Sequence, residues 1–158
     1  MERNIGLTAN QQASVAQILA SLVADEYVLH TKTRNSHWNV RGPQLHDLHK
    51  FFEAQYEELD DIVDEMAERI RALGESVPGT LAKFLQAARL KEQPGQRSSA
   101  ADMIAQLLAD YETLIRQLRK DPETVGAEHH DAGTNDFLTG LMEKHEHMAW
   151  MLRAHLET

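Results

Sequence analysis

The chain has 158 residues, with 16 basic and 25 acidic side chains and a net charge of -9. This length predicts a single domain spanning residues 1–158. The negative charge disfavours binding to a phosphate backbone, and the absence of cysteine excludes disulfides and thiolate metal sites. We expect a cytoplasmic protein, because no apolar run is long enough for a membrane span or the core of a signal peptide.

The first half of the chain predicts two long helices. Thr8 is a suitable N-cap for the first, whose apolar residues recur at three- and four-residue spacing until about His37. The sequence Arg41-Gly42-Pro43 breaks this pattern, and its proline suits the first turn of the next helix. The second helix keeps a regular apolar stripe over roughly 30 residues, about 45 Å at 1.5 Å per residue. Gly74 is a natural C-terminal stop for it.

The second half predicts two more long helices after a long connection, residues 75–97. A short helix is expected in this connection after Thr80. The third long helix starts near Ser98 or Ser99 and ends at Asp121-Pro122, and a polar segment separates it from the last, which starts between Thr134 and Asp136. A crossover of this length makes the second and third helices parallel. We therefore expect an all-α, ferritin-like four-helix bundle with a short extra helix in the long connection.

Histidines and carboxylates are concentrated in and after the stretch from His37 to Glu53. Two imidazoles and several carboxylates form a ligand set that suits Fe(II), Mn or Zn better than Ca or Mg. The candidate metal ligands are His37, His49, Glu53, Asp64 and Glu68. On a helix of 100° per residue, the three carboxylates lie nearly opposite the apolar stripe, and His49 lies near its edge.

These residues cannot form one site within a single chain. His49 and Asp64 are separated by about 22 Å along the helix axis. The sequence also has no Glu-x-x-His, which marks the usual intrachain di-metal site of ferritin-like bundles. Two interpretations remain open. Asp64 and Glu68 are solvated surface charges, as most helix carboxylates are. Alternatively, a two-fold partner brings its Asp64 and Glu68 against His37 and His49, which forms two equivalent sites per dimer.

Over nearly its whole length the sequence resembles the Dps family, also called mini-ferritins. The resemblance is carried by three groups of residues. The first group is His37-Trp38-Asn39-Val40-x-Gly42 with Leu48-His49 and Glu53. The second is Asp64-x-Met66-Ala67-Glu68-Arg69 with Leu73-Gly74. The third and weaker group is Thr134-Asn135-Asp136-x-Leu138 with Trp150. The first two groups together are highly specific for this family.

The resemblance implies a hollow dodecamer that oxidises Fe(II), preferably with hydrogen peroxide, and stores ferric mineral, so that it protects against oxidative damage. The di-iron ferroxidase sites would lie between two-fold-related subunits. His37 and His49 would be ligands from one chain, and Asp64 and Glu68 would come from the partner. Glu53 falls where the family has an Asp or Glu that assists the second metal.

The two tryptophans have two possible roles. Trp38 lies beside His37 and can act as an electron source that intercepts stray radicals. Alternatively, Trp38 and Trp150 pack around the site, as large aromatic side chains usually do. His46 is absent from the family pattern, and we interpret it as a surface residue.

Acidic residues and two histidines crowd the segment before the last helix. The resemblance implies that Glu128, Asp131 and Asp136 line three-fold pores, where a negative channel concentrates cations. The alternative is a polar loop in which Asp136 favours a helix N-terminus. His129 and His130 are unusual for the family and could bind metal adventitiously.

The charge distribution argues against tight DNA binding. Arg3 is the one basic residue among the first seven, and the six lysines of the chain are scattered. Binding to a phosphate backbone requires clustered positive charge. We therefore expect weak DNA binding or none. The rival function is a nucleoid-associated shell with little oxidation activity.

Overall fold

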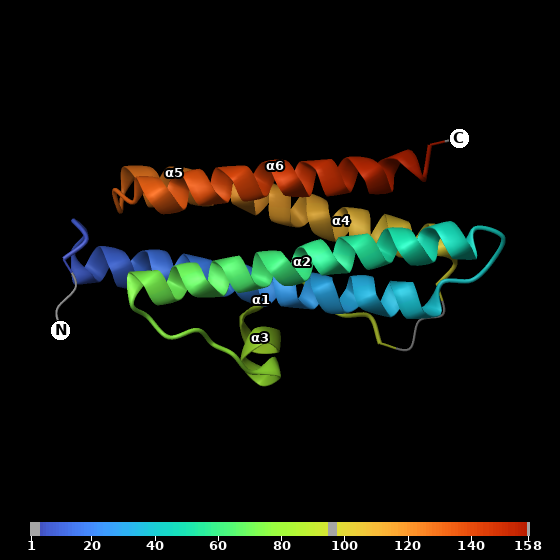
Figure 1. Ribbon diagram of the computed structural model, residues 1–158, viewed down its shortest axis with the longest axis horizontal. Helices are drawn as coiled ribbons and strands as arrows, with labels where there is room; N and C mark the ends of the chain where they lie inside the picture. The colour runs from blue at the N-terminus through green and yellow to red at the C-terminus, as the bar shows by residue number, and fades with distance from the viewer. Residues whose placement is uncertain (1–3, 95–97, 158) are drawn as a thin grey trace.

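The computed structural model describes residues 4–94 and 98–157, so that Arg3 and residues 95–97 of the long connection lie outside the described residues. The helices of the described chain are α1 (Ala9–Asn39), α2 (Leu45–Leu73), α3 (Leu81–Ala87), α4 (Ala100–Leu118), α5 (Asp121–Ala127) and α6 (Ala132–Ala154). The hairpin of α1 and α2 forms one layer, and α4 and α6 form the other (Figure 1). None of these helices is long and apolar enough to cross a membrane.

The helix ends lie where their capping residues predict. The Thr8 and Ser99 side chains each accept a hydrogen bond from the backbone N–H of the third helical residue, which completes capping boxes at the starts of α1 and α4. Thr80 caps α3 in the same way, without the reciprocal bond. Gly74 ends α2 with a φ of 91°, in the left-handed region that favours glycine.

The expected bundle is confirmed: α2 and α4 run in the same direction, and α3 lies in the crossover that joins them (Figure 1). The chain differs from expectation after Asp121. The sequence predicts an irregular segment there, but Pro122 occupies the first turn of α5, where its fixed φ and missing N–H are tolerated. The last helix also begins earlier, at Ala132, because the Asp131 side chain accepts a hydrogen bond from the N–H of Thr134.

One buried carboxylate ties the crossover to the bundle. Asp25 of α1 is fully buried. Its Oδ1 accepts hydrogen bonds from the backbone N–H groups of Arg89 (2.6 Å) and Leu90 (3.1 Å). Its Oδ2 lies 2.6 Å from two nitrogens of the Arg89 guanidinium. The segment after α3 is therefore held by the carboxylate as well as by apolar packing.

Candidate metal centre

The α1–α2 hairpin brings two histidines together. His37 lies in the last turn of α1, and His49 lies near the start of α2. The connection turns sharply at Gly42, whose φ of 113° is rarely adopted by other residues. The two imidazole rings stack with their centroids 3.7 Å apart and an interplanar angle of 22°. Residues that are separated along the chain thus form a compact imidazole pair.

The backbone determines which ring nitrogen of each histidine can bind a metal. The Nδ1 of His37 lies 2.8 Å from the carbonyl oxygen of His49, and the Nδ1 of His49 lies 2.9 Å from the carbonyl oxygen of His37. A carbonyl only accepts, so each Nδ1 must carry the proton and donate it. In the neutral rings both Nε2 atoms then keep a free lone pair. Metal-ligating histidines are commonly held in this way.

The candidate carboxylates of the same chain do not meet this pair. Glu53 lies one turn beyond His49 and is half-buried, whereas Asp64 and Glu68 are exposed further along α2. Across residues 4–94 and 98–157 of one chain, no three histidine or carboxylate side chains converge on a possible metal position. The single chain therefore presents an imidazole pair and, separately, two outward-facing carboxylates.

Aromatic and cationic side chains surround the histidine pair. Tyr56 packs edge-on against His37, with ring centroids 5.3 Å apart. The Arg34 guanidinium lies 5.4 Å from the Trp38 ring and 5.1 Å from the Tyr56 ring, within cation–π range. Trp38 itself is 66% exposed, an unusually open position for so large an apolar group. Trp150 is also exposed and contacts His147 of its own helix.

Tyr56 and Arg34 were not among the residues that the sequence singled out. Their positions relative to the histidines nevertheless carry a signal. Tyr56 follows His49 by two helical turns, and Arg34 precedes His37 by one, so each shares a helix face with a candidate ligand.

The three pore candidates differ in the burial and in the contacts of their side chains. Asp131 is only 4% exposed and accepts hydrogen bonds from the Arg69 guanidinium at 3.0 and 3.3 Å and from the N–H of Thr134 at 2.9 Å. Asp131 is thus the N-cap of α6, the kind of position that the sequence suggested for Asp136. Asp136 and Glu128 are exposed.

The remaining histidines near these sites lie at the surface. His46 is exposed in the first turn of α2. His129 is half-buried, and the exposed His130 has a φ of 57°, which places it in a sharp turn before α6. None of the three joins a cluster of metal-ligating side chains in the described part of the chain.

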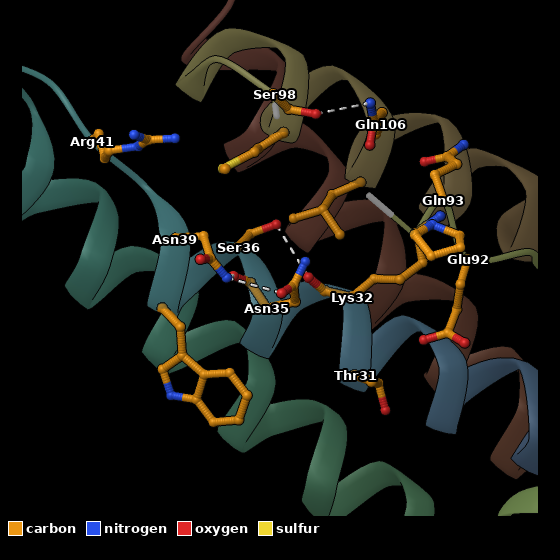
Figure 2. Close-up of a pocket in the computed structure, with 14 residues that line it drawn as sticks. Thr31, Lys32, Asn35, Ser36, Asn39, Arg41, Glu92, Gln93, Ser98 and Gln106 are labelled. Carbon is orange, nitrogen blue, oxygen red and sulfur yellow. Dashed lines mark hydrogen bonds between the residues drawn. The ribbon is translucent and has the colours of Figure 1, made fainter. Parts of the chain in front are cut away.

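A pocket of about 510 Å³ lies away from the histidine pair. It lies between the end of α1, the segment before α4 and α4 itself, with Asn35, Asn39 and Arg41 at its wall (Figure 2). Lys32 donates a hydrogen bond to the Lys91 carbonyl (3.0 Å) and forms an ion pair with Asp110. Burial raises the pKa of Asp110, although Lys32 opposes that change. Polar and apolar side chains both line the pocket, and neither histidine of the pair is among them.

A four-helix bundle with a helix in its crossover and an imidazole pair at its hairpin defines a ferritin-like protein. The family model for the ferritin-like domain matches residues 16–158. The chain is 38% identical to DNA protection during starvation protein 2 of Bacillus anthracis, over 90% of this chain and 96% of that protein. It is 49% identical to an uncharacterized low temperature-induced protein of Nostoc, over 98% of this chain and 86% of that protein.

Structural comparison agrees. The chain superposes on the crystal structure of a DPS protein from Vibrio cholerae with a TM-score of 0.91 and 31% identity. The match covers 99% of this chain and 98% of that one. That protein is described as a member of the ferritin-like diiron-carboxylate proteins. The chain therefore belongs to the Dps family of the ferritin-like superfamily.

Proposed function

We propose that this protein is a cytoplasmic ferroxidase and iron store. It oxidises Fe(II), preferably with hydrogen peroxide, at di-iron sites between two-fold-related subunits, and it keeps the ferric product inside a hollow dodecamer. The observation that carries the proposal is the pair of His37 and His49, whose Nδ1 atoms are both held by carbonyls while their Nε2 atoms remain free. This pair lacks converging carboxylates within the described part of its own chain.

The missing ligands are Asp64 and Glu68 of a two-fold partner. The axial gap of about 22 Å on α2 separates the two halves of the site in one chain. An isologous contact repeats itself, so one encounter of the imidazole end with the carboxylate end makes two sites. Glu53, one turn beyond His49, assists the second iron. Imidazole and carboxylate together suit Fe(II).

The di-iron stoichiometry explains the protection against oxidative damage. Hydrogen peroxide accepts two electrons, and each Fe(II) supplies one, so two Fe(II), one peroxide and two protons give two Fe(III) and two waters. A single Fe(II) would instead release a hydroxyl radical. Trp38, adjacent to His37 and in contact with the Arg34 guanidinium, is placed to donate an electron to a stray radical. The alternative role of Trp38 is packing against the partner subunit.

The proposal is tested by sizing the purified protein and then following Fe(II) oxidation with and without peroxide. We expect a dodecamer, faster oxidation with peroxide, and two Fe(II) consumed per peroxide. His37→Ala should slow oxidation at least about tenfold, since loss of even a supporting group at a metal site costs about that much. A small oligomer that oxidises Fe(II) no faster than buffer would contradict the proposal.

The same purified protein also tests the rival function, a nucleoid-associated shell. A nucleoid-associated shell would retard DNA in a gel-shift assay at moderate salt, and a subunit with a net charge of -9 should not. Retardation of DNA combined with little oxidation would favour the rival.

We also propose that the exposed Glu128 and Asp136 supply the negative charge that draws Fe(II) through a pore, whereas Asp131 is buried and pairs with Arg69. Asp136→Asn should slow iron uptake at low ionic strength and leave the melting temperature unchanged, because its side chain is exposed. Asp131→Ala should instead lower stability by about 1–2 kcal/mol, since it removes the cap of α6. Stopped-flow oxidation at two salt concentrations and thermal melts measure both effects. Equal iron uptake by Asp136→Asn and wild type at low salt would show that Asp136 does not attract Fe(II) at a pore.

A further inference from the structure

The centre of the bundle contains polar groups that the proposed function does not use. Glu26 of α1, Tyr111 of α4 and His145 of α6 are all fully buried. Two of their atoms, Oε2 of Glu26 and the hydroxyl of Tyr111, have no partner in the described chain, and Glu26 Oε1 and His145 Nε2 face only each other. Each buried polar group without a partner is costly, so a cluster of them in one core requires an explanation.

The three side chains of this cluster are neighbours in the core. His145 Nδ1 lies 2.9 Å from the Leu141 carbonyl oxygen and so carries a proton, which leaves a lone pair on Nε2 only in the neutral ring. Burial lowers the pKa of His145, but Glu26 and the Leu141 carbonyl raise it above its ordinary value, so a metal must displace a proton from Nε2. That Nε2 lies 2.8 Å from Glu26 Oε1, a distance that also fits an ion pair if the ring is protonated. Two ligand atoms about 2.1 Å from one cation are about 3 Å apart when the bond angle is near 90°. The Tyr111 ring centroid is 5.5 Å from that of His145.

We propose that Glu26, His145 and Tyr111 bind one divalent transition-metal ion inside the bundle of each chain. Carboxylate, imidazole and phenol are hard-to-borderline donors that suit Fe(II), Co(II) or Zn(II). With Glu26 the one carboxylate in the set, the site holds one metal and is separate from the inter-subunit centre. It also differs from a two-metal bundle site, because Met142 stands three residues before His145 where such a site needs a glutamate.

A groove lies between α2 and α6, and the cluster residue His145 belongs to α6. The groove has a volume of about 380 Å³, and Gln55, Glu58 and Met148 are among its lining residues. Gln55 donates a hydrogen bond to the Met148 carbonyl at 3.3 Å, while its own Oε1 is buried without a partner. The Glu58 carboxylate lies 3.2 Å from the Lys144 ammonium at the mouth.

The rival explanation is a buried ion pair between Glu26 and a protonated His145, which binds nothing and only fixes how the helices pack. The two explanations predict different metal contents. An ion pair predicts no metal in the core at any concentration, whereas the proposed site predicts one ion per chain.

The test is an anaerobic Co(II) titration of the assembled protein, with bound metal counted after gel filtration. Wild type should bind one more Co(II) per chain than Glu26→Gln, an isosteric change. Tyr111→Phe should bind that ion at least about tenfold more weakly, and Glu143→Gln, exposed on the same helix as His145, should behave as wild type. Because His37, His49, Asp64 and Glu68 are intact in all four proteins, Fe(II) oxidation should be unchanged, which separates this proposal from the proposed function.

If Glu26→Gln does not fold, a crystal of the wild type soaked in Co(II) tests the proposal instead. Anomalous scattering should show one peak between α1, α4 and α6. Absence of that peak, or equal Co(II) content in wild type and a folded Glu26→Gln, would overturn the site and leave a buried ion pair only.

Discussion

Shells that mix His37→Ala subunits with Asp64→Ala subunits are expected to regain about a quarter of the wild-type rate of Fe(II) oxidation, although each variant alone is at least about tenfold slower than wild type. The recovery follows from two-fold symmetry. In a mixed dimer, one site combines both damaged halves, and the other combines the intact histidines of one chain with the intact carboxylates of its partner. Random pairing makes half of the dimers mixed, with one working site of two in each, which gives about a quarter of all sites.

The matched control mixes His37→Ala with His49→Ala. Both histidines of a site come from the same chain, where their rings stack 3.7 Å apart. A mixed dimer of these variants therefore has one damaged histidine in each site, and no recovery is expected. The measurement is the initial rate of Fe(II) oxidation after the variants are unfolded and reassembled together. A site shared between two chains would be contradicted if the mixed shells of His37→Ala and Asp64→Ala showed no recovery of the oxidation rate. Equal recovery in the control mixture would contradict it as well.

Much of the fold follows from local signals in the sequence. Thr8 and Ser99 are capping residues, Gly74 is a stop, and the long apolar stripe of α2 has a period that only a helix satisfies. The helix α5 was missed because its seven residues are too few to show a period. Pro122 was interpreted as the end of a helix, but proline is equally suited to a first turn.

The sequence supplies the residue types of the candidate site but only part of its geometry. The spacing of His49 and Asp64 on one helix excludes a shared metal in one chain, since rise per residue is a local property. The reciprocal hydrogen bonds of His37 and His49 were not predictable, because they depend on how the hairpin closes at Gly42. The contact of Glu26 with His145 was likewise hidden, because it joins α1 to α6 through tertiary packing.

Asp25→Asn is expected to lower the stability of the fold by about 2–3 kcal/mol. The fully buried carboxylate accepts two backbone hydrogen bonds and contacts the Arg89 guanidinium. Removing one partner of a buried ion pair costs about 3–5 kcal/mol, but the side chain of Arg89 is 37% exposed, so water stabilises its unpaired charge and reduces the loss. The asparagine side chain carries a donor amide in place of one acceptor oxygen. When this amide faces the N–H groups of Arg89 and Leu90, those donors lose their acceptor, which adds to the loss of stability.

A loss of this size should lower the melting temperature by about 5–10 °C. Thermal melts must be compared at one protein concentration, because assembly stabilises the folded subunit by mass action. Asp61→Asn is the control, since Asp61 is an exposed aspartate of α2 and its substitution should change the melting temperature by little. Adding Arg89→Leu to Asp25→Asn should cost less than Arg89→Leu alone, because the pair is already broken. Equal melting temperatures for Asp25→Asn and Asp61→Asn would mean that apolar packing alone holds the crossover to α1.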